Sequence, residues 1–195
     1  MKLVFATSNI NKIKEVKCLL PDGFQIRNLQ DIGCNEELPE TQATIEGNSL
    51  QKAQYVAEKY TCDCFAEDSG LEVDALDGEP GVDTAFYSGS RDASQNMALL
   101  LHHLKNEINR KAQFKTVFTL FIDGKWHQFT GIVTGKIAEK QSGKEGFGYD
   151  PIFIPDGADI TFGEMIATQK TTYSHRAKAF KLMTSYLLQN FDFSK

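Results

Sequence analysis

Two adjacent carboxylates, Glu67 and Asp68, follow the short apolar run 64–66 and precede Ser69 and Gly70. The apolar run predicts a strand, and we expect the two acids at its end. Like charges side by side repel each other, and a bound cation relieves that repulsion. Mg²⁺ prefers oxygen ligands of this kind. The alternative is a plain turn, because Asp, Ser and Gly all favour turns.

A polar loop containing Thr7, Ser8, Asn9 and Lys12 precedes a helical apolar pattern that ends before Pro21. Backbone N–H groups at a helix N-terminus point outward and bind anions. Hydroxyls, amides and a cation at that position suit a triphosphate. The loop lacks the glycines and the GK[ST] sequence of a Walker A loop. The alternative is an ordinary helix cap.

Glu40 follows Pro39 in an acidic loop, and Lys52 lies on the helix expected after it. A carboxylate at Glu40 is placed to share a cation with Asp68. The alternative is a solvated surface pair, because charged side chains are mostly exposed.

The segment 146–150 reads Gly-Phe-Gly-Tyr-Asp. Glycine lets a ligand approach the backbone closely, and an aromatic face stacks on a nucleotide base. Asp150 is suited to accept hydrogen bonds from a base edge. The alternative is a mobile loop that closes a hairpin.

Three cations, Lys170, His175 and Arg176, precede or open the last expected helix, which Ser174 is placed to cap. Positive charge at a helix N-terminus is unfavourable with the helix dipole, and an anionic or polar ligand offsets that cost. The alternative is a plain cap with solvated neighbours. Taken together, the five clusters describe a site for a nucleoside triphosphate with Mg²⁺.

The elements that carry these clusters alternate between strand and helix in the first half of the chain. A helix is expected over 44–60, with Leu50, Ala53, Val56, Ala57 and Tyr60 on its apolar face and Lys52 off that face. Two β-rich runs, 114–122 and 126–134, flank Asp123-Gly124, which is a hairpin signal. This order predicts an α/β fold with a mixed sheet.

Composition narrows the class of protein. A length of 195 residues predicts a single domain over 1–195. The net charge of −5, with no long basic stripe, argues against a polymeric nucleic acid as partner. No apolar run approaches the roughly 20 residues of a membrane span, and the start lacks a signal-peptide region. We therefore expect no membrane partner and a cytoplasmic location.

The four Cys and four His lack zinc-site spacings, so reduced thiols are expected.

The same motifs carry a family resemblance. Residues 7–12 (TSNINK), 66–71 (AEDSGL), Pro80-Gly81, 146–150 (GFGYD) and 174–176 (SHR) stand in the order typical of one family. Over nearly its whole length the chain resembles the inosine triphosphate pyrophosphatases, also called non-canonical purine NTP pyrophosphatases. The resemblance implies a homodimer with a long mixed β-sheet flanked by helices and two lobes around a central cleft. It also implies Mg²⁺-dependent hydrolysis of ITP, dITP and XTP to the monophosphate and pyrophosphate, which cleanses the nucleotide pool.

By motif match, Asp68 resembles the family's general base and a metal ligand, and Glu40 resembles the second metal ligand. The substrate contacts implied by the resemblance are Thr7, Ser8, Asn9, Ile10, Asn11, Lys12, Lys52, Ser69, Phe147, Gly148, Tyr149, Asp150, Lys170, His175 and Arg176.

The chain departs from the family pattern at three positions. Glu67 stands where members often carry Asp, Phe86 where many bacterial members carry Arg, and Gly47 where a Glu commonly precedes Asn48. Two other functions therefore stay open. One is a related pyrophosphatase that acts on modified pyrimidines or methylated bases, and the other is a nucleotide-binding module without turnover.

Overall fold

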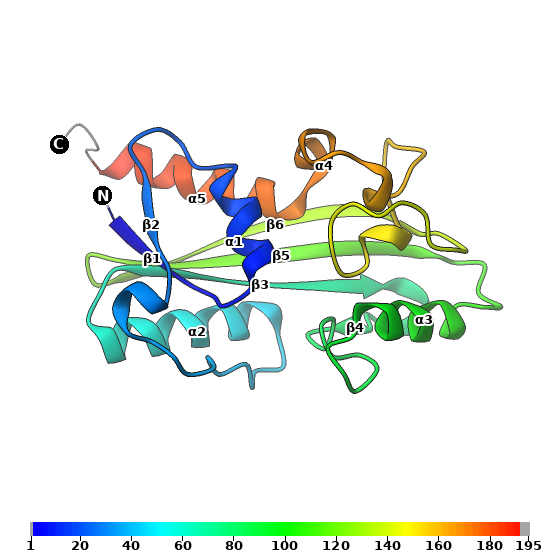
Figure 1. Ribbon diagram of the computed structural model, residues 1–195, viewed down its shortest axis with the longest axis horizontal. Helices are drawn as coiled ribbons and strands as arrows, with labels where there is room; N and C mark the ends of the chain where they lie inside the picture. Colours follow the sequence, from blue (N-terminus) through cyan, green and yellow to red (C-terminus); the bar gives the residue numbers. More distant parts are fainter. Residues whose placement is uncertain (1, 192–195) are drawn as a thin grey trace. The chain divides into compact units, whose positions relative to one another are not determined.

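The computed structural model describes residues 2–191 and has a mixed sheet with helices (Figure 1). The strands are β1 (Lys2–Ala6), β2 (Gln25–Arg27), β3 (Cys64–Val73), β4 (Pro80–Gly81), β5 (Lys111–Ile122), β6 (Lys125–Ile137) and β7 (Phe153–Pro155). The helices are α1 (Ile10–Lys17), α2 (Ile45–Tyr60), α3 (Ala93–His103), α4 (Ala167–Tyr173) and α5 (His175–Asn190).

The sheet order is β2-β1-β3-β5-β6-β7, and β4 pairs with β3. β1 pairs in parallel with β2 and β3, whereas β4 and β7 pair antiparallel with β3 and β6. Both pairing modes therefore occur in one sheet, which confirms the predicted mixed α/β class.

The chain divides into two compact units. Of the described residues, unit 1 contains 2–68, 116–131 and 176–191, and unit 2 contains 69–115 and 132–175. The boundary crosses β3 between Asp68 and Ser69, and it separates His175 from Arg176. The single domain and the central cleft remain predictions.

In unit 1 the strands β1 and β3 bury both of their faces. Because successive residues of a strand point to opposite faces, Val4, Cys64 and Ala66 pack with α2, whereas Phe5 and Phe65 pack with α1 and α5. The Phe5 and Phe65 rings stack with centroids 4.6 Å apart. Figure 1 shows α2 on one side of these strands and α1 and α5 on the other.

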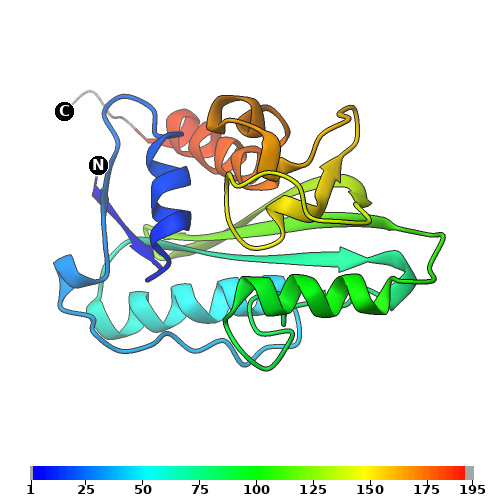
Figure 2. The ribbon, with the colours of Figure 1, turned by 45° about the vertical axis from the view of Figure 1, so that its right-hand side comes forward.

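In unit 2 a second core forms around α3. Met97, Leu100 and Leu104 pack with Leu71 and Phe114, and α3 runs beside β3 (Figure 2). Asp92 caps α3, because its Oδ1 accepts from the backbone N–H groups of Ser94 and Gln95 at 2.8 and 3.2 Å.

Several boundaries differ from the sequence-based expectation. β3 does not end at the acids but continues to Val73, because Leu71 and Val73 extend the buried alternation. β6 continues to Ile137, beyond the β-rich run 126–134 that the sequence indicates. The short α4 was not predicted, because its sequence ATQKTTY has no apolar helical period. The hairpin prediction is correct, and Asp123 and Gly124 have the positive φ values, 47° and 72°, that a two-residue turn needs.

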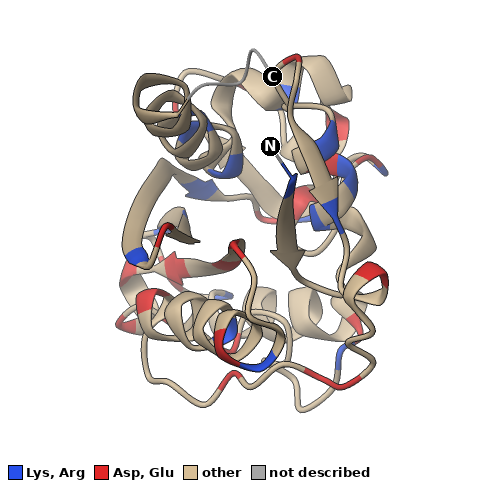
Figure 3. Ribbon diagram, turned by 90° about the vertical axis from the view of Figure 1, so that its left-hand side faces the viewer, with Lys and Arg blue, Asp and Glu red and all other residues tan. Residues whose placement is uncertain are grey.

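Lys and Arg are interspersed with Asp and Glu along the ribbon (Figure 3). All four cysteines are free thiols, as expected. Within residues 2–191, no helix has the length and apolar character that crossing a membrane requires.

Candidate functional site

The two adjacent acids lie in the middle of β3, not at a strand end. Glu67 continues the face of Phe65, toward α1 and α5, and Asp68 continues the face of Ala66, toward α2. The expectation that the strand ends at these two acids is therefore wrong. The two carboxylates still repel each other, because the charge of Glu67 raises the pKa of Asp68. Their paired cations differ, since Asp68 pairs with Lys52 and Glu67 pairs with Lys12 and Arg176.

Asp68 and Glu40 meet at one ammonium group. Lys52 Nζ lies 3.0 Å from Asp68 Oδ1 and also donates to Glu40 Oε1. Burial raises the pKa of Asp68, against the opposing effect of Lys52 and Lys12. Burial by itself lowers the pKa of Lys52, but Asp68 and Glu40 together outweigh it and raise that pKa. Two carboxylates and one cation thus form a compact cluster in which Lys52 and Asp68 are largely buried and the Glu40 side chain is 42% exposed.

Lys52 lies on the buried face of α2, contrary to the helical pattern expected from the apolar residues alone. That face also carries Asn48 and Ser49. Ser49 Oγ donates to the carbonyl of Val117 at 2.9 Å and lies 2.9 Å from Thr119 Oγ1. Polar residues are tolerated on this face because they have hydrogen-bond partners.

The loop that carries Glu40 is hydrogen-bonded to α2. Gln51 Oε1 accepts from the backbone N–H of Thr41 at 2.9 Å, and Gln51 Nε2 donates to Thr41 Oγ1 at 2.8 Å. Asn48 Oδ1 accepts from the backbone N–H of Gln42 at 2.9 Å. These bonds hold the two residues directly after Glu40 against α2, and they therefore restrain the backbone of Glu40.

Earlier in the same loop, Glu36 accepts from Tyr55 and Tyr60 at 3.0 and 2.9 Å and pairs with Lys59. These contacts, the one with Lys59 above all, lower the pKa of Glu36 to about 2. The sequence analysis missed both loop anchors. The sequence indicates only that the residues of α2 that hold this loop lie in one predicted helix.

The donor set of Glu40 and Asp68 fits Mg²⁺. Within residues 2–191, no group of three or more His, Cys, Asp or Glu side chains is arranged to hold a metal ion. Mg²⁺ usually takes only one or two carboxylates and completes its shell with waters and substrate phosphates. Two carboxylates already converge on one positive charge at Lys52. The chain therefore supplies what a shared Mg²⁺ site needs from the protein.

The predicted phosphate loop opens α1. Asn9 caps the helix, because its Oδ1 accepts from the backbone N–H groups of Asn11 and Lys12 at 3.0 and 3.2 Å. Thr7 Oγ1 accepts from the Asn9 N–H at 3.2 Å. The cap considered as the alternative is thus present. Ser8 and Ile10 are exposed at the start of the helix.

Behind this loop, Glu67 is fully buried in a charged network of unit 1. Lys12 Nζ lies 2.8 Å from its Oε2, and the Arg176 guanidinium donates to its Oε1 at 3.1 and 3.3 Å. Thr116 Oγ1 lies 3.4 Å from the same oxygen, and Arg176 also pairs with Glu15. Glu15 and Thr116 were not singled out in the sequence.

In unit 2 Asp150 organises the glycine-flanked loop. Its Oδ2 accepts from the backbone N–H of Phe147 and from Lys170 Nζ, both at 2.7 Å. The Lys170 ammonium lies 5.1 Å from the centroid of the Phe147 ring. Gly146 has a φ of +74°, and a Cβ there would lie 1.9 Å from Asp150 Oδ2. The loop therefore depends on a glycine at 146.

His175 and Tyr149 are also buried in unit 2. The His175 ring stacks on Phe114, with centroids 4.7 Å apart and an interplanar angle of 8°. The Tyr149 hydroxyl makes no hydrogen bond to the described residues, and burial raises its pKa. Ser69 is half-buried on β3, directly after Asp68.

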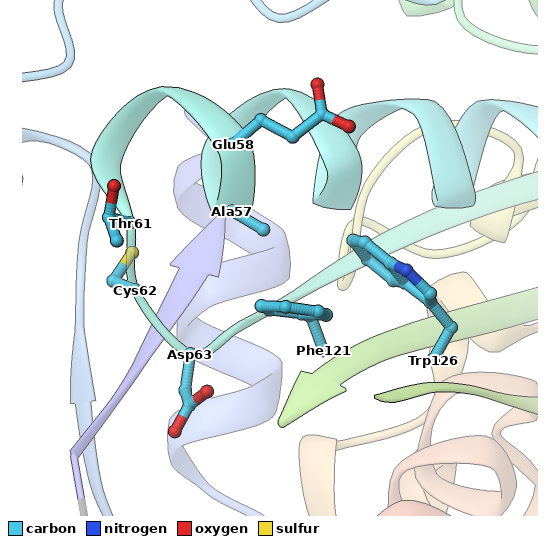
Figure 4. A pocket seen from close by; sticks show the side chains of 7 residues that line it. All are labelled: Ala57, Glu58, Thr61, Cys62, Asp63, Phe121 and Trp126. Carbon is cyan, nitrogen blue, oxygen red and sulfur yellow. The ribbon is translucent and has the colours of Figure 1, made fainter. Parts of the chain in front are cut away.

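A surface hollow in unit 1 is formed by other residues. The residues that line it are Ala57, Glu58, Thr61, Cys62, Asp63, Phe121 and Trp126 (Figure 4). None of these seven is a predicted site residue, so the hollow does not belong to the clusters described above.

Comparison with known proteins decides the family. The model of the Ham1 family matches residues 3–186. This chain belongs to the Ham1 family. A relative from Flavobacterium johnsoniae, named dITP/XTP pyrophosphatase, is 53% identical over 188 residues, which cover 96% of this chain and 98% of that protein. A Bacillus subtilis protein of the same name is 40% identical over 189 residues, covering 94% and 96%.

Solved structures of Ham1 proteins have the same fold. The Staphylococcus aureus Ham1 protein matches with a TM-score of 0.90 at 35% identity, covering 98% of this chain and 100% of that one. A dITP/XTP pyrophosphatase from Mycobacterium abscessus matches with a TM-score of 0.78 at 38% identity, covering 94% and 98%. The resemblance inferred from the motifs is therefore confirmed.

Proposed function

We propose that this Ham1 protein hydrolyses deaminated purine nucleoside triphosphates, namely ITP, dITP and XTP, to the monophosphate and pyrophosphate. The observation that carries the proposal is the convergence of the Asp68 and Glu40 carboxylates on one cation, Lys52 Nζ. The names of the similar proteins support the substrate class.

In the proposed reaction, Asp68 accepts a proton from a water molecule whose oxygen attacks the α-phosphorus. The bond between the α-phosphorus and the bridging oxygen breaks, and pyrophosphate leaves with the bonding electron pair. The raised pKa of Asp68 suits it to accept a proton. Lys12, Lys52 and Lys170 are assigned to stabilise the negative charge that spreads in the transition state.

Glu40 and Asp68 are the residues that would hold Mg²⁺, which when bound neutralises phosphate charge and polarises phosphoryl oxygens. Thr7, Ser8, Asn9, Ile10 and Asn11 are assigned to phosphate and sugar contacts beside Lys12, with Ser69 following Asp68.

Binding of the purine base is assigned to the loop that Asp150 organises. The Phe147 ring offers a stacking face and Asp150 accepts hydrogen bonds, with Gly148 and Tyr149 between them. Selectivity is assigned to hydrogen bonds with the 6-oxo group, donated by His175, Arg176 or backbone N–H groups near Phe147. A site built around one polar group rejects an analogue that lacks it, because buried partners are left unpaired. We also propose a homodimer that works in the cytoplasm, without a polymeric nucleic acid or membrane partner.

The test is pyrophosphate release from ITP, dITP, XTP, ATP and dUTP with Mg²⁺. We expect release from the three deaminated purines to exceed release from ATP and dUTP. A preference for dUTP supports the related pyrophosphatase that acts on modified pyrimidines instead. Nucleotide binding with no release from any substrate supports a binding module.

A further inference from the structure

Glu67 is a buried acid to which the proposed reaction assigns no role. Its side chain is 0% exposed, and it contacts cations from two separate elements, Lys12 of α1 and Arg176 of α5. Burying an ion pair usually gains little stability over an apolar pair of the same size, because both charges lose water. Stability alone therefore does not explain this network. Holding one of its members in a fixed orientation is a physical explanation.

Of the two cations in this network, Lys12 is the more exposed and the one open to a ligand. Its side chain is 14% exposed, against 3% for Arg176 and 0% for Glu67. Its backbone N–H is held by the Asn9 cap at 3.2 Å, and its ammonium is held by Glu67 Oε2 at 2.8 Å. The backbone and the charged end of Lys12 are thus both restrained, and Glu67 restrains the charged end.

The Glu67 side chain points away from the cluster of Asp68, Glu40 and Lys52, although its charge still raises the pKa of Asp68 and of Lys52. The two side chains leave opposite faces of β3. Arg176, whose guanidinium donates twice to Glu67 Oε1, holds the carboxylate on the α1 and α5 side.

We propose that Glu67 is a positioning residue that holds the Lys12 ammonium in the orientation used to bind the substrate's phosphates, with Arg176 holding Glu67 in turn. This proposal rests on the function proposed above. It assigns Glu67 to phosphate binding through Lys12 and not to the metal.

A double-mutant cycle tests the coupling. Glu67→Gln and Lys12→Met are each expected to lower kcat/KM for dITP by about tenfold or more, mainly through KM. In the Lys12→Met background, Glu67→Gln is expected to change kcat/KM by less than about twofold, because its target is gone. Additive losses would overturn the proposal. A raised Mg²⁺ requirement in Glu67→Gln would also overturn it, because it would place Glu67 with the metal.

Two variants separate orientation from folding. Glu15→Gln removes another carboxylate that contacts Arg176, and its kcat/KM is expected to stay within about twofold of wild type. If Glu67→Gln does not fold, Glu67→Asp repeats the cycle, because it keeps the charge but is one methylene too short to hold Lys12. Thermal unfolding of every variant checks the fold.

A failure of the proposed function can be distinguished from a failure of the positioning role. If the wild type binds dITP and releases no pyrophosphate, the function is wrong, and the same cycle measured on the dITP Kd decides the positioning role. Coupling between Glu67 and Lys12 in Kd supports it, and additive losses overturn it.

Discussion

Lys52 Nζ lies 3.0 Å from Asp68 Oδ1 and also donates to Glu40. Asp68 is 7% exposed, so its carboxylate has lost most of its hydration. The Lys52 ammonium offsets much of the free-energy cost of that loss. Asp68 is thereby held as an oriented acceptor beside a second carboxylate. This arrangement makes separate predictions for the two acids, because Asp68 is buried and Glu40 is exposed.

Asp68→Asn should leave the fold intact and lower kcat for dITP by about 10²–10⁴-fold, because an amide does not accept the water proton. Pyrophosphate release measures the rate, and thermal unfolding checks the fold. Asp63→Asn, which changes an acid just before the same strand, is the control and should keep normal turnover. Normal turnover in Asp68→Asn would refute its assignment as the base.

Glu40→Gln should raise the Mg²⁺ concentration for half-maximal activity by at least about tenfold, because a neutral amide is a weaker ligand. The Glu40 side chain is 42% exposed, so the free energy of unfolding should change by less than about 0.5 kcal/mol. Mg²⁺ titrations of pyrophosphate release make the measurement. Glu37→Gln, at an exposed position in the same loop, should titrate as wild type does. An unchanged Mg²⁺ requirement in Glu40→Gln would remove Glu40 from the ligand set.

Local chemistry made much of the fold predictable. Asp92 begins α3, and Thr44 Oγ1 accepts from the Gly47 N–H at 3.0 Å at the start of α2. Asp123-Gly124 closes the β5–β6 hairpin. Each of these depends on residues within a few positions of one another, which is the range over which a sequence pattern reports structure.

The network around Glu67 was not predictable in this way. The direction of the Glu67 side chain depends on β3 continuing through Asp68. The sequence Ser69-Gly70 is equally compatible with a strand that stops after the two acids. The Glu67 partner Arg176 lies 109 residues later, and the Arg176–Glu15 pair spans 161 residues. No local pattern connects such positions, so the sequence predicted Arg176 as a site residue but not its buried contacts.

Gly146→Ala should raise KM for dITP by about tenfold or more, because the new Cβ would lie 1.9 Å from Asp150 Oδ2 and displace the group that holds Phe147 and Lys170. The free energy of unfolding should also fall by about 1–3 kcal/mol. Steady-state kinetics and urea unfolding measure the two effects.

Gly157→Ala is the matched control for Gly146→Ala. Its φ is +85°, but the nearest atom to an added Cβ is Tyr173 Cε1 at 3.9 Å. This variant should show the backbone strain alone, with KM unchanged. Equal KM values in Gly146→Ala and wild type would show that Asp150 does not shape the substrate site.

Glu36→Gln should lose stability in a pH-dependent way. Lys59, Tyr60 and Tyr55 lower the pKa of Glu36 to about 2 from an ordinary value of 4.5. A carboxyl with a lower pKa in the folded protein stabilises the fold fully above the unfolded value, and this contribution is lost as the pH falls through the folded value. The urea midpoint of Glu36→Gln should therefore lie below that of wild type at pH 7, and the two should converge between pH 4.5 and 2.

Glu37→Gln is the control, and its urea midpoint should differ from that of wild type by the same small amount at both ends of that range. A difference for Glu36→Gln that stays constant from pH 7 to pH 2 would show that the Glu36 charge does not hold the Glu40 loop on α2.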